Sequence, residues 1–257
     1  MLEDRQSYKA LARYYDAFQE TSDLKQTVDW ILRTCDNHLG VDQSSEMRRL
    51  ADLGCGTGSL AVLLATHAFQ ICAIDQSSAM LDELVAKCEL LSEKERARLQ
   101  IMQGDIVNYR FADKQDVLIA LTDSLNHVPA EAMHELFLTA AFNLRNGGLF
   151  LFDLLQESFL ASERGNQTFF AELPDGDELP AVSLIWENRW QPETKTAVSD
   201  LTFFERRKDS DVYLRSTDRI VEYYHDLNTI QYLWHDQFET IDVRDEEDRR
   251  IFVLRRL

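Results

Sequence analysis

Two kinds of apolar spacing alternate between about residues 48 and 155. Short, nearly continuous apolar runs predict strands, which lie at 49–53, 70–75, 99–103, 116–121 and 148–153. Apolar residues that recur every three or four positions predict helices, which lie at 59–67, 78–92 and 129–145. Such alternation is typical of a parallel sheet with helices on both faces, because each crossover helix covers part of the sheet. The pattern therefore predicts an α/β fold.

The segments on either side of this region have other patterns. Helical spacing predicts two helices near the N-terminus, at 7–18 and 24–39. Beyond residue 157, one-by-one alternation predicts an antiparallel meander, with strands at 181–191, 196–207 and 212–224. A mobile loop is expected at Pro174–Asp177. A helix through Trp234 and a final hairpin of strands 238–244 and 251–256 would then complete the first sheet. We divide the chain into N-terminal helices, a core and an inserted antiparallel sheet, at residues 1–47, 48–157 with 226–257, and 158–225.

Local signals support several helix boundaries. Ser77 can cap the helix that begins at residue 78, because a serine hydroxyl accepts a hydrogen bond from an otherwise unpaired amide. Pro129 suits the first turn of the next helix, and Asn146-Gly147-Gly148 suits its end. These signals favour the helical segments that the spacing predicts.

The most informative stretch is Leu50–Gly58, where an apolar strand enters a turn with glycines at 54, 56 and 58. We call residues 54–58 the glycine turn. Glycine adopts positive φ without strain, so the backbone can turn sharply and bring its amides against a ligand. The helix that begins at Ser59 adds its unpaired N-terminal amides. The stretch therefore predicts a nucleotide-binding turn. Ser59 stands where a dehydrogenase fingerprint has its third glycine, which argues against a dinucleotide site.

With Asp52 before the turn and Asp75 after the second strand, this stretch resembles motif I of the class I S-adenosylmethionine-dependent methyltransferases. The resemblance implies a Rossmann-like, seven-stranded, mostly parallel sheet whose last strand is antiparallel, and S-adenosylmethionine as cofactor. It places Asp52 near the methionyl amino group, Asp75 at the ribose hydroxyls and Asp105 at the adenine. Asp75 could instead cap the following helix, and Asp105 could be a polar turn residue. The full predicted cofactor set is Tyr14, Trp30, Asp52, Gly54, Cys55, Gly56, Gly58, Asp75, Gln76, Met80, Gly104, Asp105, Ile106 and Leu121.

A polar loop, Thr122–His127, follows the fourth strand and resembles the D-S-L-N sequence of a group of bacterial small methyltransferases. Ligands bind at the carboxyl ends of parallel strands, so we expect Asp123 to position the donor or the acceptor. His127 could take a proton, or could belong to a plain loop. The loop lacks the proline-rich signature of nucleic-acid amino-methyltransferases. Asp153 ends the next strand, but Leu154 stands where metal-dependent relatives have asparagine, so no metal is predicted.

Charge and cysteine content narrow the functional classes. The 257 residues include 45 acidic and 27 basic ones, giving a net charge of −18, which would repel a phosphate backbone. Three short basic clusters, at 206–208, 249–250 and 255–256, are interpreted as solvated strand ends. The four cysteines form no C-x-x-C pair, and the N-terminus lacks the apolar core of a signal peptide. No apolar run approaches the ~18 residues that span a bilayer. We expect a cytoplasmic protein that binds neither nucleic acid nor membrane.

These observations favour an S-adenosylmethionine-dependent methyltransferase that acts on a small molecule. Other readings stay open: a dehydrogenase, a protein or RNA methyltransferase, and a noncatalytic regulatory or partner-binding protein that binds S-adenosylmethionine. An exposed antiparallel sheet would also allow a homodimer.

Overall fold

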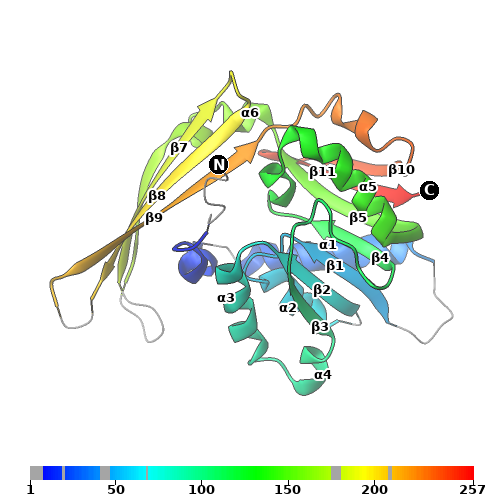
Figure 1. The fold of residues 1–257 in the computed structure, drawn as a ribbon, viewed down its shortest axis with the longest axis horizontal. Coiled ribbons are helices and arrows are strands. Elements are labelled where there is room, and N and C mark those ends of the chain that lie inside the picture. Colours follow the sequence, from blue (N-terminus) through cyan, green and yellow to red (C-terminus); the bar gives the residue numbers. More distant parts are fainter. Residues whose placement is uncertain (1–7, 19–20, 41–46, 68, 175–180, 208–209) are drawn as a thin grey trace.

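The computed structural model describes residues 8–18, 21–40, 47–67, 69–174, 181–207 and 210–257, without the side chains of residues 21–23. Two sheets dominate the structure, with the N-terminal residues between them (Figure 1). Most of the predicted loop at Pro174–Asp177 lies outside the described residues.

The core sheet has seven strands in the order β10-β11-β5-β4-β1-β2-β3. Five of these strands pair in parallel with one another. They are β1 (Arg48–Leu53), β2 (Phe69–Asp75), β3 (Leu99–Gln103), β4 (Gln115–Ala120) and β5 (Leu144–Leu155). The hairpin strands β10 (Phe238–Asp245) and β11 (Arg249–Arg256) close one edge, and β11 runs antiparallel to β5. The predicted Rossmann-like architecture, with an antiparallel last strand, is confirmed.

Alternate residues of the core strands pack into two separate layers of the hydrophobic core, one on each face of the sheet. Leu50 of β1 and Val117 of β4 face α1 (Thr21–His38), α2 (Ser59–Ala65) and α3 (Ser78–Cys88). Their neighbours Ala51 and Leu118 face α5 (Met133–Asn143) and the short helix η5 (Ile230–Leu233). Because successive side chains of a strand point to opposite faces, nearly continuous apolar runs are required here.

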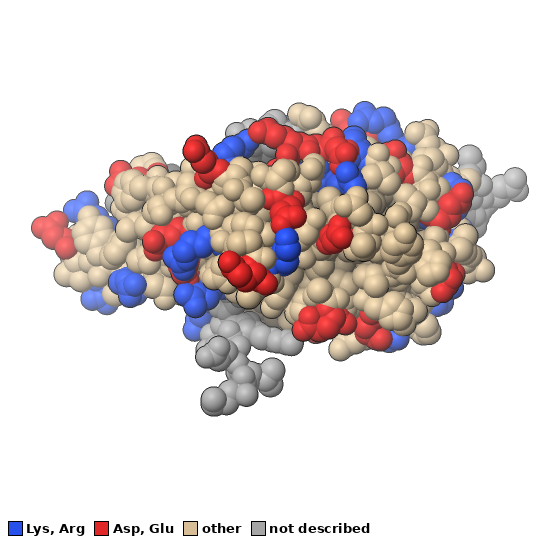
Figure 2. All heavy atoms as spheres, turned by 90° about the horizontal axis from the view of Figure 1, so that it is seen from above, with Lys and Arg blue, Asp and Glu red and all other residues tan. Residues whose placement is uncertain are grey.

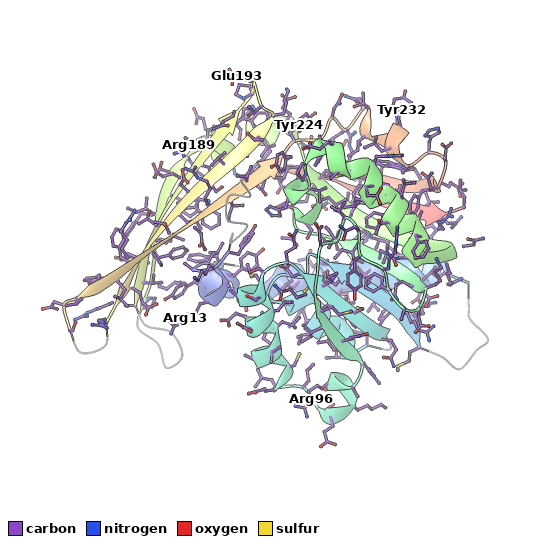
Figure 3. All side chains as sticks on the ribbon, viewed as in Figure 1. Arg13, Arg96, Arg189, Glu193, Tyr224 and Tyr232 are labelled. Carbon is purple, nitrogen blue, oxygen red and sulfur yellow. The ribbon has the colours of Figure 1, made fainter. Side chains whose placement is uncertain are left out.

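The insertion sheet contains β6 (Thr168–Leu173), β7 (Val182–Gln191), β8 (Thr196–Arg206) and β9 (Tyr213–Tyr223), all antiparallel and in chain order. Three of these strands match the predicted meander. The fourth, β6, was not predicted; it is an edge strand whose residues are half-buried or exposed, so its apolar signal is weak. Arg189 and Glu193 project from the side of this sheet that faces away from the core (Figure 3). Association through this sheet stays a prediction.

The N-terminal segment, residues 8–18, lies between the two sheets. Its regular part is a 3-10 helix, η1 (Ala12–Phe18), instead of the predicted helix from residue 7, which itself lies outside the described residues. The Asp218 carboxylate of β9 accepts hydrogen bonds from the amides of Ala10 and Leu11, at 2.8 and 2.7 Å. These bonds replace the helical hydrogen bonds that the two amides would otherwise make.

On the other side, the N-terminal segment is bound to the glycine turn. The Asp16 carboxylate accepts hydrogen bonds from the Thr57 and Ser59 hydroxyls and forms an ion pair with Lys87 of α3. Lys87 also donates to the Thr57 carbonyl at 2.9 Å. The segment therefore connects the core to the insertion sheet.

Some helix boundaries differ from the predictions. The Ser77 cap is confirmed, since its hydroxyl accepts from the Met80 amide, but α3 ends at Cys88 and a separate turn, α4 (Glu93–Arg96), follows. The residues expected to end α5, Asn146-Gly147-Gly148, lie inside β5, where the pairing with β4 is irregular. The Asn143 side chain donates to the Thr139 and Tyr109 carbonyls and so ends the helix earlier. The region 226–234 forms only the 3-10 turn η5, after η3 (Ala130–Ala132) and the short α6 (Glu157–Leu160) and η4 (Arg164–Asn166).

Candidate active site

The three glycines of the glycine turn all have positive φ, at +74°, +54° and +71° for Gly54, Gly56 and Gly58. A Cβ atom on Gly54 would lie 2.8 Å from the Ser124 hydroxyl, and one on Gly58 would overlap Leu84 of α3. Gly56 differs, because no atom lies within 4 Å of its ideal Cβ position. The outer two glycines are thus required by packing, while the central one faces open space.

Two carboxylates flank this turn. The Asp52 side chain is buried, and its Oδ2 atom has no hydrogen-bond partner among the described residues. Burial, followed by the nearby Asp75 charge, raises the pKa of Asp52 to about 7. Asp75 accepts hydrogen bonds from the amides of Gly56 and Ser77, at 2.9 and 2.8 Å. Its carboxylate thus fixes the open part of the turn and also bonds the residue that caps α3.

A small cavity of about 50 Å³ opens over the turn. It brings together five of the predicted cofactor residues, Asp52, Gly54, Cys55, Gly56 and Leu121. Tyr15 and Leu24 cover it from the N-terminal side, and Thr122 closes it toward the loop after β4. These last three residues were not in the predicted cofactor set.

The remaining predicted cofactor residues lie outside this cavity. Gln76 is exposed, and Met80 is buried in the first turn of α3. After β3, Asp105 accepts from the Val107 amide at 3.0 Å, Gly104 packs against Ile74, and Ile106 is buried in the core. A contact of these residues with the cofactor stays a prediction.

Two aromatic residues of the predicted cofactor set contact other parts of the chain, and their contact with the cofactor stays a prediction. Tyr14 stacks on Phe203 of the insertion sheet and donates its hydroxyl hydrogen bond to Glu205. Trp30 lies under the Arg244 guanidinium of β10, at the opposite edge of the core sheet. Neither residue lines a cavity at the glycine turn. The periodicity of their helices could not distinguish the face that packs from the face that lines the site.

The loop after β4 is held in an unusual conformation. Thr122 and Asp123 have positive φ, at +59° and +66°, which is uncommon for residues with a side chain. Both amides donate to the Asp153 carboxylate of β5, at 2.8 and 2.9 Å. Asp153 therefore compensates the strain of this conformation, in which Asp123 lines the large cavity described below.

Arg249, at the start of β11, binds the carboxylates gathered at this loop. Its guanidinium pairs with Asp123 at 2.9 Å, Asp153 at 3.4 Å and Asp248 at 2.6 Å. The interpretation of residues 249–250 as a solvated strand end is therefore wrong for Arg249, whose side chain is only 20% exposed. Arg250 beside it is 27% exposed and pairs with the exposed Asp245.

Burial opposes ionisation in this cluster. Desolvation, partly offset by Arg249 and reinforced by Asp153, raises the pKa of Asp123 to about 8. Desolvation likewise raises the pKa of Asp153, while Arg249 opposes it. On the opposite wall, burial raises the pKa of Glu222, a residue of β9, to about 7. Glu222 was not predicted, because an acidic residue in an alternating strand carries no local signal of function.

His127 ends the loop and is held from both ring nitrogens. Its Nδ1 lies 3.3 Å from the Val221 carbonyl, and its Nε2 lies 2.9 Å from the Tyr8 hydroxyl. A carbonyl only accepts, so Nδ1 carries the proton and Nε2 accepts the hydrogen bond that Tyr8 donates. Burial lowers the pKa of His127 and raises that of Tyr8. The imidazole is therefore neutral and already paired.

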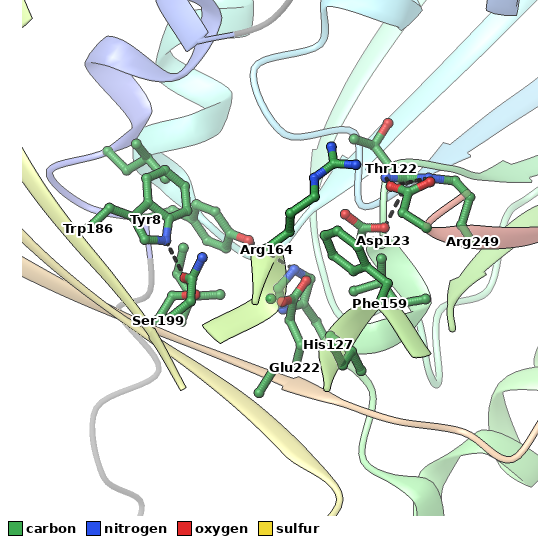
Figure 4. A pocket seen from close by; sticks show the side chains of 18 of the residues that line it. Tyr8, Thr122, Asp123, His127, Phe159, Arg164, Trp186, Ser199, Glu222 and Arg249 are labelled. Atoms are coloured by element: carbon green, nitrogen blue, oxygen red, sulfur yellow. Dashed lines mark hydrogen bonds and ion pairs between the residues drawn. The ribbon is translucent and has the colours of Figure 1, made fainter. Parts of the chain in front are cut away.

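These residues line a larger cavity of about 230 Å³ between the loop after β4 and the insertion sheet (Figure 4). Its walls are mixed: carboxylates and guanidiniums on the core side, aromatic rings toward the N-terminal segment and the insertion. Tyr15 and Thr122 line both this large cavity and the small cavity over the glycine turn. The two cavities therefore share part of their walls.

Comparisons with known proteins agree with this arrangement. Residues 50–148 match the family model described as "Methyltransferase domain". A methyltransferase from Clostridium acetobutylicum ATCC 824, described as S-adenosylmethionine-dependent, superposes with a TM-score of 0.75 at 25% identity, over 96% of this chain and 98% of that one. This chain is a class I S-adenosylmethionine-dependent methyltransferase.

Two further proteins are similar to this methyltransferase, one in sequence and one in fold. The Bacillus subtilis (strain 168) protein named "Putative methyltransferase YqeM" is 28% identical over 198 residues, which are 77% of this chain and 72% of that protein. The sugar N-methyltransferase KedS8 from Streptoalloteichus shares the fold, with a TM-score of 0.78 over 100% of this chain and 96% of that one, at 15% identity.

The glycine turn of this methyltransferase fits its cofactor. The unpartnered Oδ2 of Asp52 offers an acceptor for the methionyl ammonium group, and the open space at Gly56 lets a ligand approach the backbone. Bound S-adenosylmethionine supplies a methyl group on a positively charged sulfur. Among the described residues, no group of three His, Cys, Asp or Glu side chains is placed to hold a metal ion. No helix in the described part of the chain is long and apolar enough to cross a bilayer.

Proposed function

We propose that this methyltransferase transfers the methyl group to a small molecule bound in the large cavity. The wall that the two cavities share at Tyr15 and Thr122 carries the proposal. A donor at the glycine turn and an acceptor in the large cavity would meet there. Displacement at a methyl carbon requires this alignment of the two reactants.

The dimensions of the large cavity support a small acceptor. Its volume of about 230 Å³ is below the roughly 300–1,000 Å³ of most ligand sites, and walls from three parts of the chain surround it. In this proposal, residues 1–47 and the insertion at 158–225 shape the acceptor site, through Tyr8 and Trp186 among others. The name of KedS8, a sugar N-methyltransferase, is consistent with a small acceptor.

The surface charge offers no support for a nucleic-acid acceptor. The net charge is −18, and on the face shown in Figure 2 the Lys and Arg side chains lie interspersed with Asp and Glu. A polyanion is attracted by a continuous basic surface, which this face does not present.

Isotope transfer tests the proposal directly. The protein is incubated with methyl-labelled S-adenosylmethionine and a cell extract separated into low-mass metabolites, protein and RNA. We expect label to enter the low-mass fraction. Label that enters only protein or RNA would contradict a small-molecule acceptor.

A matched pair of variants locates the transfer. Trp186→Ala removes an aromatic wall of the large cavity, whereas Tyr213→Ala changes an exposed ring at the far end of the insertion sheet. We expect Trp186→Ala to lower labelling at least ~10-fold. It should leave the Kd of S-adenosylhomocysteine unchanged, and Tyr213→Ala should alter neither quantity.

A further inference from the structure

The large cavity is lined by the carboxylate of Glu222, which is unpaired within the described part of the chain. Glu222 projects from β9 toward the cavity, and no described residue forms a hydrogen bond or ion pair with its carboxylate. Its charge acts on Tyr8 and on Asp123, both of which line the same cavity. A part-buried carboxylate without a partner lowers the stability of the folded protein unless a ligand supplies the partner.

The charged groups of the cavity wall favour a cationic ligand. The Arg249 guanidinium is shared by three carboxylates, and Arg164, the other cation of the cavity wall, is paired with Glu247. Glu222 adds a further negative charge opposite this cluster. When these carboxylates are ionised, the cavity carries an excess of negative charge, and a bound cation would both neutralise it and favour the ionised forms.

The aromatic walls favour the same ligand. Tyr8, Tyr15, Phe159 and Trp186 line the same cavity as Glu222 and Asp123. Aromatic faces attract ammonium groups, and the attraction is greater where water is excluded. Carboxylate and rings together form a site for an organic cation.

Resting on the proposed function, we propose that the acceptor is a primary or secondary amine whose ammonium group binds Glu222, which removes its proton before methyl transfer. His127 is less suited to this role, because its Nε2 already accepts the Tyr8 hydrogen bond. The Glu222 carboxylate has no such competitor among the described residues.

The transfer balances without any further reactant. The ammonium proton passes to the Glu222 carboxylate, which becomes the neutral acid, and the amine nitrogen regains its lone pair. The nitrogen–carbon bond then forms while the carbon–sulfur bond of the donor breaks, and its electron pair stays on sulfur. The methylated product leaves as an ammonium ion, and Glu222 returns its proton to water.

Burial sets Glu222 near the right proton affinity. Its pKa, raised to about 7 by desolvation and lowered by Arg249, lets it accept a proton and release it near neutral pH. The other titratable groups that face it are Tyr8, His127, Asp123, Asp248 and the guanidiniums of Arg164 and Arg249. A shortage of carboxylate below pH 7 should therefore slow the reaction.

The experiment identifies the methylated atom first. The low-mass extract is treated with ¹³C-methyl S-adenosylmethionine, and the product is examined by carbon NMR, which separates N-methyl from O-methyl and S-methyl carbons. We expect N-methyl signals. O-methyl or S-methyl products alone would overturn the amine while leaving the small-molecule function intact, whereas label found only in protein or RNA would overturn both.

Two variants then test the role of Glu222. With the extract as acceptor, Glu222→Gln should lower the rate at least ~10-fold at pH 6.5, and the deficit should shrink as pH rises toward 9.5, where free amine is available. Glu222→Asp should recover part of the rate. An unaltered rate in Glu222→Gln, or a deficit that is constant with pH, would overturn the proton-accepting role; S-adenosylhomocysteine binding, measured by calorimetry, should be unchanged in both variants.

Discussion

The Asp52 carboxylate is buried at the end of β1, and its Oδ2 atom accepts no hydrogen bond from a described residue. Neutral or ionised, this oxygen atom has no partner among the residues that the structure describes. Its proximity to Asp75 adds a like charge, which further raises its pKa. A cationic ligand group at this position would reverse both effects, because it would supply the partner and favour the ionised form. Binding at Asp52 therefore comes at the expense of stability without ligand.

This reasoning predicts opposite effects of Asp52→Asn on stability and binding. The pKa of Asp52 is about 7 in the folded protein, against an ordinary value of 3.8, so its stabilising contribution is complete below pH 4 and is lost as pH rises through 7. Removing the charge should raise the free energy of unfolding at pH 8 by up to about 4 kcal/mol and have little effect at pH 4. Denaturant unfolding at both pH values, together with calorimetry of S-adenosylmethionine binding, checks this.

The same variant should bind S-adenosylmethionine at least ~10-fold more weakly, since it loses a charged partner of the ligand. Asp82→Asn, on the exposed face of α3, is the matched control and should change neither quantity. Unchanged ligand affinity in Asp52→Asn would contradict the assignment of the methionyl ammonium group to this residue.

At the scale of elements, the turn between β1 and α2 gives its three glycines two different tasks. Gly54 and Gly58 allow close packing against Ser124 and Leu84, so their lack of a side chain serves the fold. Gly56 faces open space and is fixed by the Asp75 carboxylate, so its lack of a side chain serves the ligand. The spacing of the glycines in the sequence does not reveal this division.

Alanine substitutions should separate the two tasks. Gly58→Ala should cost about 2–4 kcal/mol of stability, because strain at positive φ adds to overlap with Leu84. Gly56→Ala should cost about 1 kcal/mol, from the backbone strain alone, yet weaken S-adenosylhomocysteine binding strongly. Urea unfolding and calorimetry measure the two effects. The cost of Gly58→Ala should be smaller in a Leu84→Ala background, where the overlapping side chain is absent. If Gly58→Ala lowered the free energy of unfolding equally in both backgrounds, the overlap with Leu84 would not be the cause.

The elements also show why prediction from the sequence succeeded in the core and failed at the acceptor site. Core strands such as β4 and β5 are buried on both faces, so their apolar runs are unambiguous. The glycine turn is local, and residues eight positions apart specify it. The large cavity is instead assembled from Tyr8, His127, Glu222 and Arg249, which come from four distant segments. Only the tertiary fold brings them together, and none has a neighbour in the sequence that indicates its role.

At the scale of the whole molecule, the insertion sheet is fastened to the core from two sides. The buried Asn126 side chain donates to the Tyr223 carbonyl at 2.9 Å and accepts from the Leu155 amide at 3.1 Å. Nearby, Tyr224 marks the point at which β9 returns to the core (Figure 3). The N-terminal segment forms the second connection, through Asp218 on one side and Asp16 on the other. The position of the sheet over the site therefore depends on both connections.

Loss of the Asp218 connection should loosen the acceptor site while preserving the core. Asp218→Ala removes the acceptor of the Ala10 and Leu11 amides, and these amides should lose their protection from hydrogen exchange. The acceptor KM should rise several-fold, because Tyr8 would no longer be held against His127. Exchange mass spectrometry and steady-state kinetics measure the two effects.

Asp200→Ala is the matched control for this change. Asp200 lies on the neighbouring strand β8, but its pairs with Arg189 and Arg219 are at the surface, where an ion pair contributes about 1 kcal/mol or less. It should leave both exchange at residues 10–11 and the acceptor KM unchanged. Equal effects of the two variants would show that the insertion sheet, and not the N-terminal segment, controls the site.

Tyr15 and Thr122 belong to the walls of both cavities, so neither ligand can settle without touching a surface that the other also uses. In thermodynamic terms the two sites share a coupling free energy, and that coupling must be reciprocal. If bound cofactor changes the affinity for the acceptor by some factor, bound acceptor changes the affinity for the cofactor by the same factor. After transfer, the two products would accordingly influence each other's dissociation, and contacts at this shared wall would affect the order in which they leave.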